Sequence, residues 1–159
     1  MRARLLALVC TGVAAALISA APFAAEHPHH DQGAPATLTL DQGRKWPTDE
    51  PLRQGMERMR AAMAQALPAI HADTTKAPQY RSLAGPVQKE VAYIVANCHL
   101  APDADAMLHQ LIAELLAGAD AMQGKAKGVT PREGAIKVVQ ALDDYGRYFD
   151  HPGWQPLTH

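Results

Sequence analysis

With 159 residues, of which 48% are hydrophobic, the chain is long enough for one domain with a single apolar core. Its 15 basic and 16 acidic residues give a net charge of −1, so neither nucleic acid nor an anionic membrane surface is expected as a partner. Evidence of function must therefore come from the helical pattern and from the sulfur and imidazole side chains.

The first 25 residues have the layout of a secretory signal peptide. Arg2 and Arg4 precede an apolar run, residues 5–18, that is interrupted by small residues. A membrane-spanning helix needs about 20 apolar residues, so this run is short for an anchor. We therefore expect cleavage near residue 25, export to the periplasm, and a mature chain that is not an integral membrane protein.

Cleavage changes the charge and the cysteine content. Loss of Arg2 and Arg4 leaves 13 of the 15 basic residues against 16 acidic ones, a net charge of −3. Cys98 is then the single cysteine in an oxidising compartment, so no disulfide can form within the mature chain. The fold must therefore be stabilised by apolar packing.

Residues 26–47 are predicted to form a flexible leader, because they are rich in Pro, Gly and polar residues and have no helical period. Near its start, His27, His29 and His30 form a short tract that can bind Cu(II), Zn(II) or Ni(II) weakly. Adventitious binding by this tract and a functional role for it both remain open. Near its end, Trp46 is a candidate to pack onto the domain.

The first helix is predicted to begin at Thr48 as its N-cap, with Asp49, Glu50 and Pro51 in the first turn, where acids and proline are favoured. Pro68 should kink or end this helix. Its apolar stripe consists of Leu52, Met56, Met59, Met63 and Leu67.

Three further helical patterns follow. The second covers residues 78–97, where Gly85 and Pro86 predict a bend. The third starts near Pro102. The fourth starts with a capping box, residues 130–133, that has proline at the first helical position.

These patterns predict an all-α protein. No segment shows a sustained two-residue alternation, so strands are not expected. Four amphipathic helices with short connections bury their stripes best as an up-down-up-down four-helix bundle, here over residues 48–150. A tail of residues 151–159 follows, and Leu111 and Leu142 are expected among the buried positions.

The methionine stripe of the first helix allows three interpretations: a soft metal site, half of a haem site, or hydrophobic core. Thioether sulfur suits Cu(I), and the periplasm is where a bacterium meets copper. Met also fills irregular gaps in helical cores, and Leu52 and Leu67 on the same stripe indicate that this face is the buried one. We rank plain core first and copper second. The metal ligands considered on this stripe are Met56, Met59 and Met63.

Other soft or borderline ligands lie on the second and third helices. Cys98 belongs to the stripe of the second helix, where it behaves as a small hydrophobe or offers a thiol to Cu(I). His109 lies at the flank of the buried face of the third helix, and Met107 widens that face. Together with His27, His29 and His30, these residues complete the set of candidate ligands.

Enzymatic motifs are absent from the sequence. It has no Gly-rich phosphate loop and no His-Glu-x-x-His, and it lacks the Glu-x-x-His pairs of ferritin-like di-iron proteins. We therefore expect a protein without enzymatic activity.

Two segments, PLRQGMERMRAAM and ALDDYGRYF, resemble the first and last helices of the periplasmic four-helix-bundle b-type cytochromes. The resemblance implies a bundle fold and haem held by a methionine of the first helix, at Met56, and a histidine of the last. Gly146 stands at the histidine position, and His151 lies beyond the helix end. The chain also has no Cys-x-x-Cys-His motif, which excludes covalently attached c-type haem. Because the histidine of the last helix is missing as well, we do not expect haem.

The sequence thus predicts an exported, monomeric or weakly dimeric helical bundle that binds or buffers a metal, with copper first. The alternatives are a b-type haem electron carrier with a changed ligand, and a sensor or interaction module that presents only a surface.

Overall fold

The computed structural model of the protein describes residues 37–158. The expected signal peptide, residues 1–25, lies outside the described residues, as do His27, His29 and His30. The described part belongs to one compact unit of the chain, residues 34–159.

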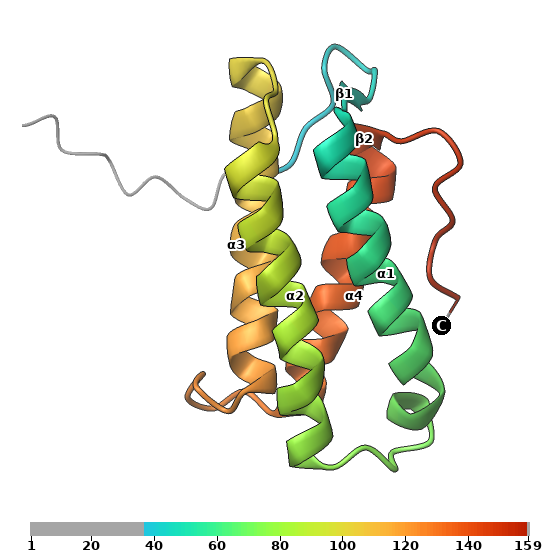
Figure 1. Cartoon of the computed structure of the whole chain (residues 1–159), viewed down its shortest axis with the longest axis vertical. Helices are drawn as coiled ribbons and strands as arrows, with labels where there is room; N and C mark the ends of the chain where they lie inside the picture. Colours follow the sequence, from blue (N-terminus) through green and yellow to red (C-terminus); the bar gives the residue numbers. More distant parts are fainter. Residues whose placement is uncertain (1–36, 159) are drawn as a thin grey trace, which may run out of the picture. The chain divides into compact units, whose positions relative to one another are not determined.

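Four long helices form this unit, and the all-α prediction is confirmed. Figure 1 shows that successive helices lead from one end of the bundle to the other and back. Helix α3 packs most closely on α4, while α2 packs on both α1 and α3. The helices are α1 (Glu50–His71), α2 (Ala77–Asn97), α3 (Pro102–Met122) and α4 (Pro131–Tyr148).

The starts of α1 and α4 show how local chemistry sets the helix bounds. The predicted capping box of α4 is present: Thr130 Oγ1 accepts from the Glu133 N–H at 3.2 Å, and the Glu133 carboxylate accepts from the Thr130 N–H at 2.7 Å. The N-cap of α1 is Asp49, one residue later than predicted, and its carboxylate accepts from the Leu52 N–H. The hydroxyl of Thr48 instead donates a hydrogen bond to the backbone carbonyl of Asp150.

The two interior prolines do not end their helices. Helix α1 runs three residues past Pro68 to His71, and α2 continues through Pro86. A proline inside a helix removes one backbone hydrogen bond. Burial of Leu67 and Ile70 on the core side holds the last turn of α1 in place despite that loss.

Two very short strands were not expected. Strand β1 (Trp46–Pro47) pairs in parallel with β2 (Phe149–Asp150), and Trp46 lies opposite Phe149. A strand of two residues is too short to show a two-residue alternation of apolar and polar side chains, so the sequence pattern could not predict it. Lys45 Nζ also donates to the carbonyl of Gly146 at 2.6 Å. Residues 37–47, at the end of the expected leader, are thus tied to the bundle.

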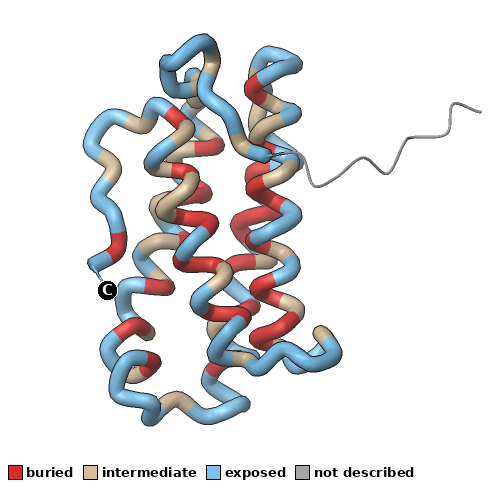
Figure 2. The backbone as a smooth tube through the Cα atoms, turned by 180° about the vertical axis from the view of Figure 1, so that it is seen from behind, coloured by how far each residue is buried: buried red, intermediate tan, exposed pale blue. Residues whose placement is uncertain are grey.

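The core runs along the inner faces of all four helices. Figure 2 shows buried positions recurring along each helix with exposed positions between them. Leu111 and Leu142 are each 1% exposed, as predicted. Glu90 is the buried charged side chain of the described core, and its carboxylate accepts a 2.7 Å hydrogen bond from Arg58.

Among residues 37–158, no helix has both the length and the apolarity needed to cross a membrane.

Candidate functional site

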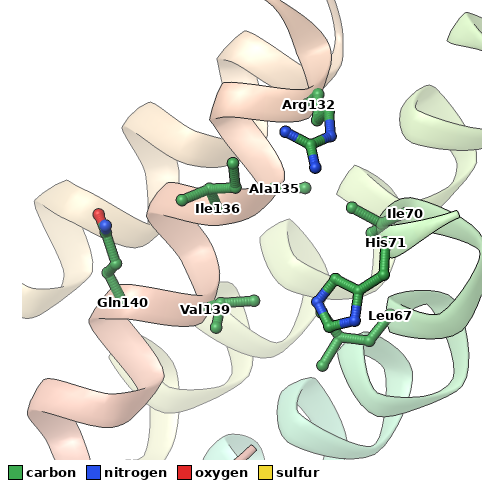
Figure 3. Close-up of a pocket in the computed structure, with 8 residues that line it drawn as sticks. All are labelled: Leu67, Ile70, His71, Arg132, Ala135, Ile136, Val139 and Gln140. Carbon is green, nitrogen blue, oxygen red and sulfur yellow. The ribbon is translucent and has the colours of Figure 1, made fainter. Parts of the chain in front are cut away.

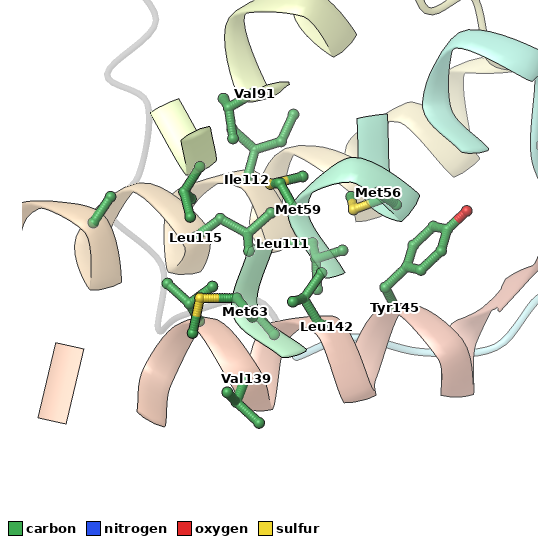
Figure 4. Close-up of a cluster of buried hydrophobic side chains, with 14 of the residues drawn as sticks. Met56, Met59, Met63, Val91, Leu111, Ile112, Leu115, Val139, Leu142 and Tyr145 are labelled. Carbon is green, nitrogen blue, oxygen red and sulfur yellow. The ribbon is translucent and has the colours of Figure 1, made fainter. Parts of the chain in front are cut away.

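The methionine stripe of α1 lies inside the core. Met56, Met59 and Met63 are each 0% exposed. Figure 4 shows their side chains among aliphatic residues of α3 and α4, including Leu111 and Leu142. The three thioethers therefore serve as packing groups in the folded chain, and a metal ion would reach them only if the core opened.

Met107 lies apart from that stripe, on α3. Its side chain is partly buried, and its sulfur accepts weak hydrogen bonds of 3.8 Å from Thr39 Oγ1 and from Gln110 Nε2. The structure thus places Met107 beneath the ordered segment that precedes α1.

Two of the predicted ligands share one depression. Cys98 and His109 both line a small hollow of about 50 Å³, and Asp105 lies beside them. A single water needs only about 10–15 Å³ of such space, so the hollow has room for an ion. Its apolar lining comes from Ile94, Val95, Leu108 and Ile112.

The end of α2 positions the thiol of this pair. Cys98 is the C-cap residue, and its N–H donates to the carbonyl of Ile94 at 2.8 Å. The backbone is extended at Cys98, and the next N–H, that of His99, donates to Asp49 Oδ2 at 2.6 Å. The Cys98 side chain is thereby held against the carboxylate of Asp49.

The imidazole of His109 is oriented by the preceding turn of α3. Its Nδ1 lies 2.9 Å from the backbone oxygen of Asp105 and 3.3 Å from Asp105 Oδ2. A carbonyl oxygen can only accept, so Nδ1 carries a proton, and the neutral ring keeps its lone pair on Nε2. Histidines that ligate metals are commonly oriented in this way by a carboxylate or carbonyl on the other nitrogen. The His109 side chain is 66% exposed.

The Cys98 thiol is held protonated at neutral pH. Burial, the hydrogen bond to Asp49, and the negative charges of Asp49 and Asp105 raise its pKa to about 12. Although burial alone would raise the pKa of Asp49, the backbone N–H groups of His99 and Leu52 outweigh it, and the net pKa is lowered. Two carboxylates therefore flank the thiol, an arrangement that opposes a thiolate but favours a cation.

This site is a pair of ligands rather than a closed cage. Within residues 37–158, no three His, Cys, Asp or Glu side chains come together as a group that could hold a metal. Cys98 and His109 thus offer two ligands to a metal ion. Any further ligand would have to come from solvent or from outside the described residues.

The C-terminal tail packs against Gly146, the position at which the resemblance to the cytochromes would place a histidine. A Cβ atom on Gly146 would lie 2.5 Å from Nε1 of Trp154. The indole of Trp154 stacks edge-on against Tyr145, with ring centroids 4.8 Å apart, and Tyr145 Oη lies 2.9 Å from Nδ1 of His151. This aromatic cluster was not predicted, although the run His151-Pro152-Gly153-Trp154 marks a turn that returns an aromatic side chain to the bundle.

Comparison with known proteins adds no relative: a scan against models of protein families, a search of curated proteins and a search of solved structures each returned no match. The case for a site therefore rests on the geometry of the chain. Of the predicted ligands within the described residues, that geometry brings together Cys98 and His109.

Proposed function

We propose that the protein is exported and binds Cu(I), with Cys98 Sγ and His109 Nε2 as its ligands, in a non-enzymatic role of holding or buffering the metal. The observation that carries the proposal is that these two residues, from different helices, line one hollow at the protein surface. Thiolate and imidazole are both copper ligands, and thiolate is a soft ligand that suits Cu(I) as well as zinc.

The number of ligands favours Cu(I) over zinc. Structural zinc is almost always held by four protein ligands in a tetrahedron, and catalytic zinc by three. The described residues offer a pair, and Cu(I) accepts two ligands in a linear arrangement. The flanking carboxylates of Asp49 and Asp105 add negative charge that attracts the ion to the hollow.

Binding requires the loss of one proton. The S–H bond of Cys98 breaks, the proton leaves to solvent, and the sulfur forms a bond to Cu(I), so no electron is transferred. Because the pKa of the thiol is about 12, the proton competes with the metal throughout the neutral range. The affinity for Cu(I) should therefore increase with pH.

The proposal is tested by competition with a Cu(I) chelator under anaerobic conditions. Cys98→Ser and His109→Gln should each weaken binding, whereas His99→Gln, an exposed neighbouring histidine, serves as the matched control. Equal affinities for the parent, Cys98→Ser and His109→Gln would refute this site. If Cu(I) binding is lost only when Met56, Met59 and Met63 are changed together to Leu, the Cu(I) site lies in the methionine stripe. A protein that purifies red would instead favour the haem alternative.

A further inference from the structure

A second cleft lies at the opposite end of α1. It opens between the last turns of α1 and the first turns of α4 and has a volume of about 210 Å³ (Figure 3). Leu67 and Ile70 of α1 and Ala135 and Val139 of α4 form its floor, and each of these is nearly fully buried. Apolar cavities of about 150 Å³ accommodate a benzene ring, so this cleft has space for a compact apolar group.

The cleft exists because α1 and α4 diverge. These two helices share few contacts, and Figure 1 shows the C-terminal end of α1 leaning away from α4. The C-terminal tail packs beside the same stretch of α1, where Leu157 is 6% exposed, and it leaves the neighbouring space open. The side chain of Ala135 is too short to fill that space, and Ile136 at the edge is 38% exposed.

The rim of the cleft is polar and carries the positive charge of Arg132. Arg132 and His71 face each other across the opening in Figure 3. Arg132 has a loose ion pair, with Nε 3.9 Å from Asp73 Oδ1, and both side chains are largely exposed. The imidazole of His71 has no hydrogen-bond partner within residues 37–158. The donors of both side chains are therefore available to an anionic group at the opening.

We infer that this cleft binds a small organic carboxylate that carries a benzene-sized aromatic or branched aliphatic group. The apolar group would lie on the aliphatic floor, and the carboxylate would pair with the Arg132 guanidinium, whose planar fork matches carboxylate geometry. His71 would supply a second donor. A cationic ligand of the same size would be repelled by Arg132, and a carboxylate without an apolar group would leave the floor empty. This inference does not depend on the copper site.

The test uses benzoate as the probe in an NMR titration of the full mature chain. Benzoate should give saturable shifts at Leu67, Ala135 and Val139. Benzyl alcohol, which is neutral, should bind more weakly, and benzylamine and acetate should give no saturable shifts at these residues. Equal responses to benzoate and benzylamine, or no saturable shift with benzoate at millimolar concentration, would overturn the inference.

Variants separate charge recognition from filling of the cleft. Arg132→Gln should weaken benzoate binding on the order of tenfold, the effect of losing one charge-assisted pair, without changing the response to benzyl alcohol. Arg147→Gln, an exposed arginine near the other end of α4, is the matched control and should bind benzoate like the parent. Ala135→Leu should abolish binding of both probes by filling the floor.

If Ala135→Leu does not fold, Ile136→Gln takes its place, because that side chain is already partly exposed; it should weaken the binding of both probes. Unchanged benzoate affinity in Arg132→Gln, or in the floor variant, would overturn the inference. A dimer in sedimentation whose formation shifts the signals of Leu67, Ala135 and Val139, and which benzoate does not dissociate, would also overturn it.

Discussion

The carboxylate of Asp49 accepts a 2.6 Å hydrogen bond from the backbone N–H of His99, which joins the start of α1 to the chain leaving α2. Its other oxygen accepts from the Leu52 N–H at 2.9 Å and so caps α1. One side chain thus fixes two helix ends. Its hydrogen bond and charge also add to the effect of burial in raising the pKa of the Cys98 thiol.

Changing Asp49 to Asn should make Cys98 more reactive. The substitution removes a negative charge that raises the pKa of the thiol, so the thiolate fraction at a given pH increases. Alkylation by iodoacetamide at pH 8 should be faster than in the parent. Asp103→Asn, on the first turn of α3, is the control and should leave the rate unchanged. A rate for Asp49→Asn equal to that of the parent, with helicity retained, would contradict the role assigned to this carboxylate.

The same residue should make stability depend on acid pH. The folded-state pKa of Asp49 is lowered, so its stabilising effect is complete above the unfolded-state pKa, about 3.9, and is lost as the pH falls through the folded value. Urea unfolding at pH 7 and at pH 2.5 measures the difference. The parent should lose more stability between these two conditions than Asp49→Asn does. Equal losses would show that another carboxylate carries the acid sensitivity.

The methionine stripe should tolerate leucine. Met56, Met59 and Met63 are fully buried among aliphatic side chains, and such volume-conserving changes usually cost less than about 1.5 kcal/mol each. The triple variant should keep its helicity in circular dichroism and its Cu(I) affinity. By contrast, Leu111→Ala or Leu142→Ala should each cost about 2–5 kcal/mol, because each leaves a cavity. A loss below about 1 kcal/mol at both leucines would contradict the assigned core.

A pair of glycine substitutions tests how the tail docks. Gly146→Ala places a methyl group 2.5 Å from the Trp154 indole, so it should destabilise the protein by about 1–3 kcal/mol and shift tryptophan emission to longer wavelength. Gly85→Ala, inside α2, has nothing within 4 Å of the added atom and should be neutral or stabilising by up to about 1 kcal/mol. Similar effects of the two changes would mean that Trp154 does not pack on Gly146.

Local signals predicted the helices well. The capping box at Thr130 and the spacing of Leu111 and Leu142 depend on neighbours within a few turns, so the sequence alone reveals them. The N-cap was misplaced by one residue because Thr48 and Asp49 are both good caps, and the choice depends on the distant partner of Thr48, Asp150.

The candidate site was only partly predictable. Cys98 and His109 were both recognised as possible ligands from their residue types, but their convergence depends on how α2 and α3 pack. The hydrogen bond from the His99 N–H to Asp49 joins residues far apart in the chain, and so does the contribution of Asp49, beside that of burial, to the raised pKa of Cys98. The cleft near Arg132 depends on the divergence of α1 and α4, which no periodicity shows.

The most direct test of the copper proposal is the Cu(I) affinity measured as a function of pH in the parent, Cys98→Ser and His109→Gln, by competition with a chelator whose own pH dependence is corrected for. Between pH 7 and 9 the parent affinity should increase about tenfold per pH unit, because each Cu(I) displaces one thiol proton. Cys98→Ser should bind Cu(I) more weakly, and its affinity should no longer increase with pH in this way. His109→Gln should also bind Cu(I) more weakly but keep the tenfold increase per pH unit. A parent affinity that does not change with pH, or that equals that of Cys98→Ser, would contradict the account.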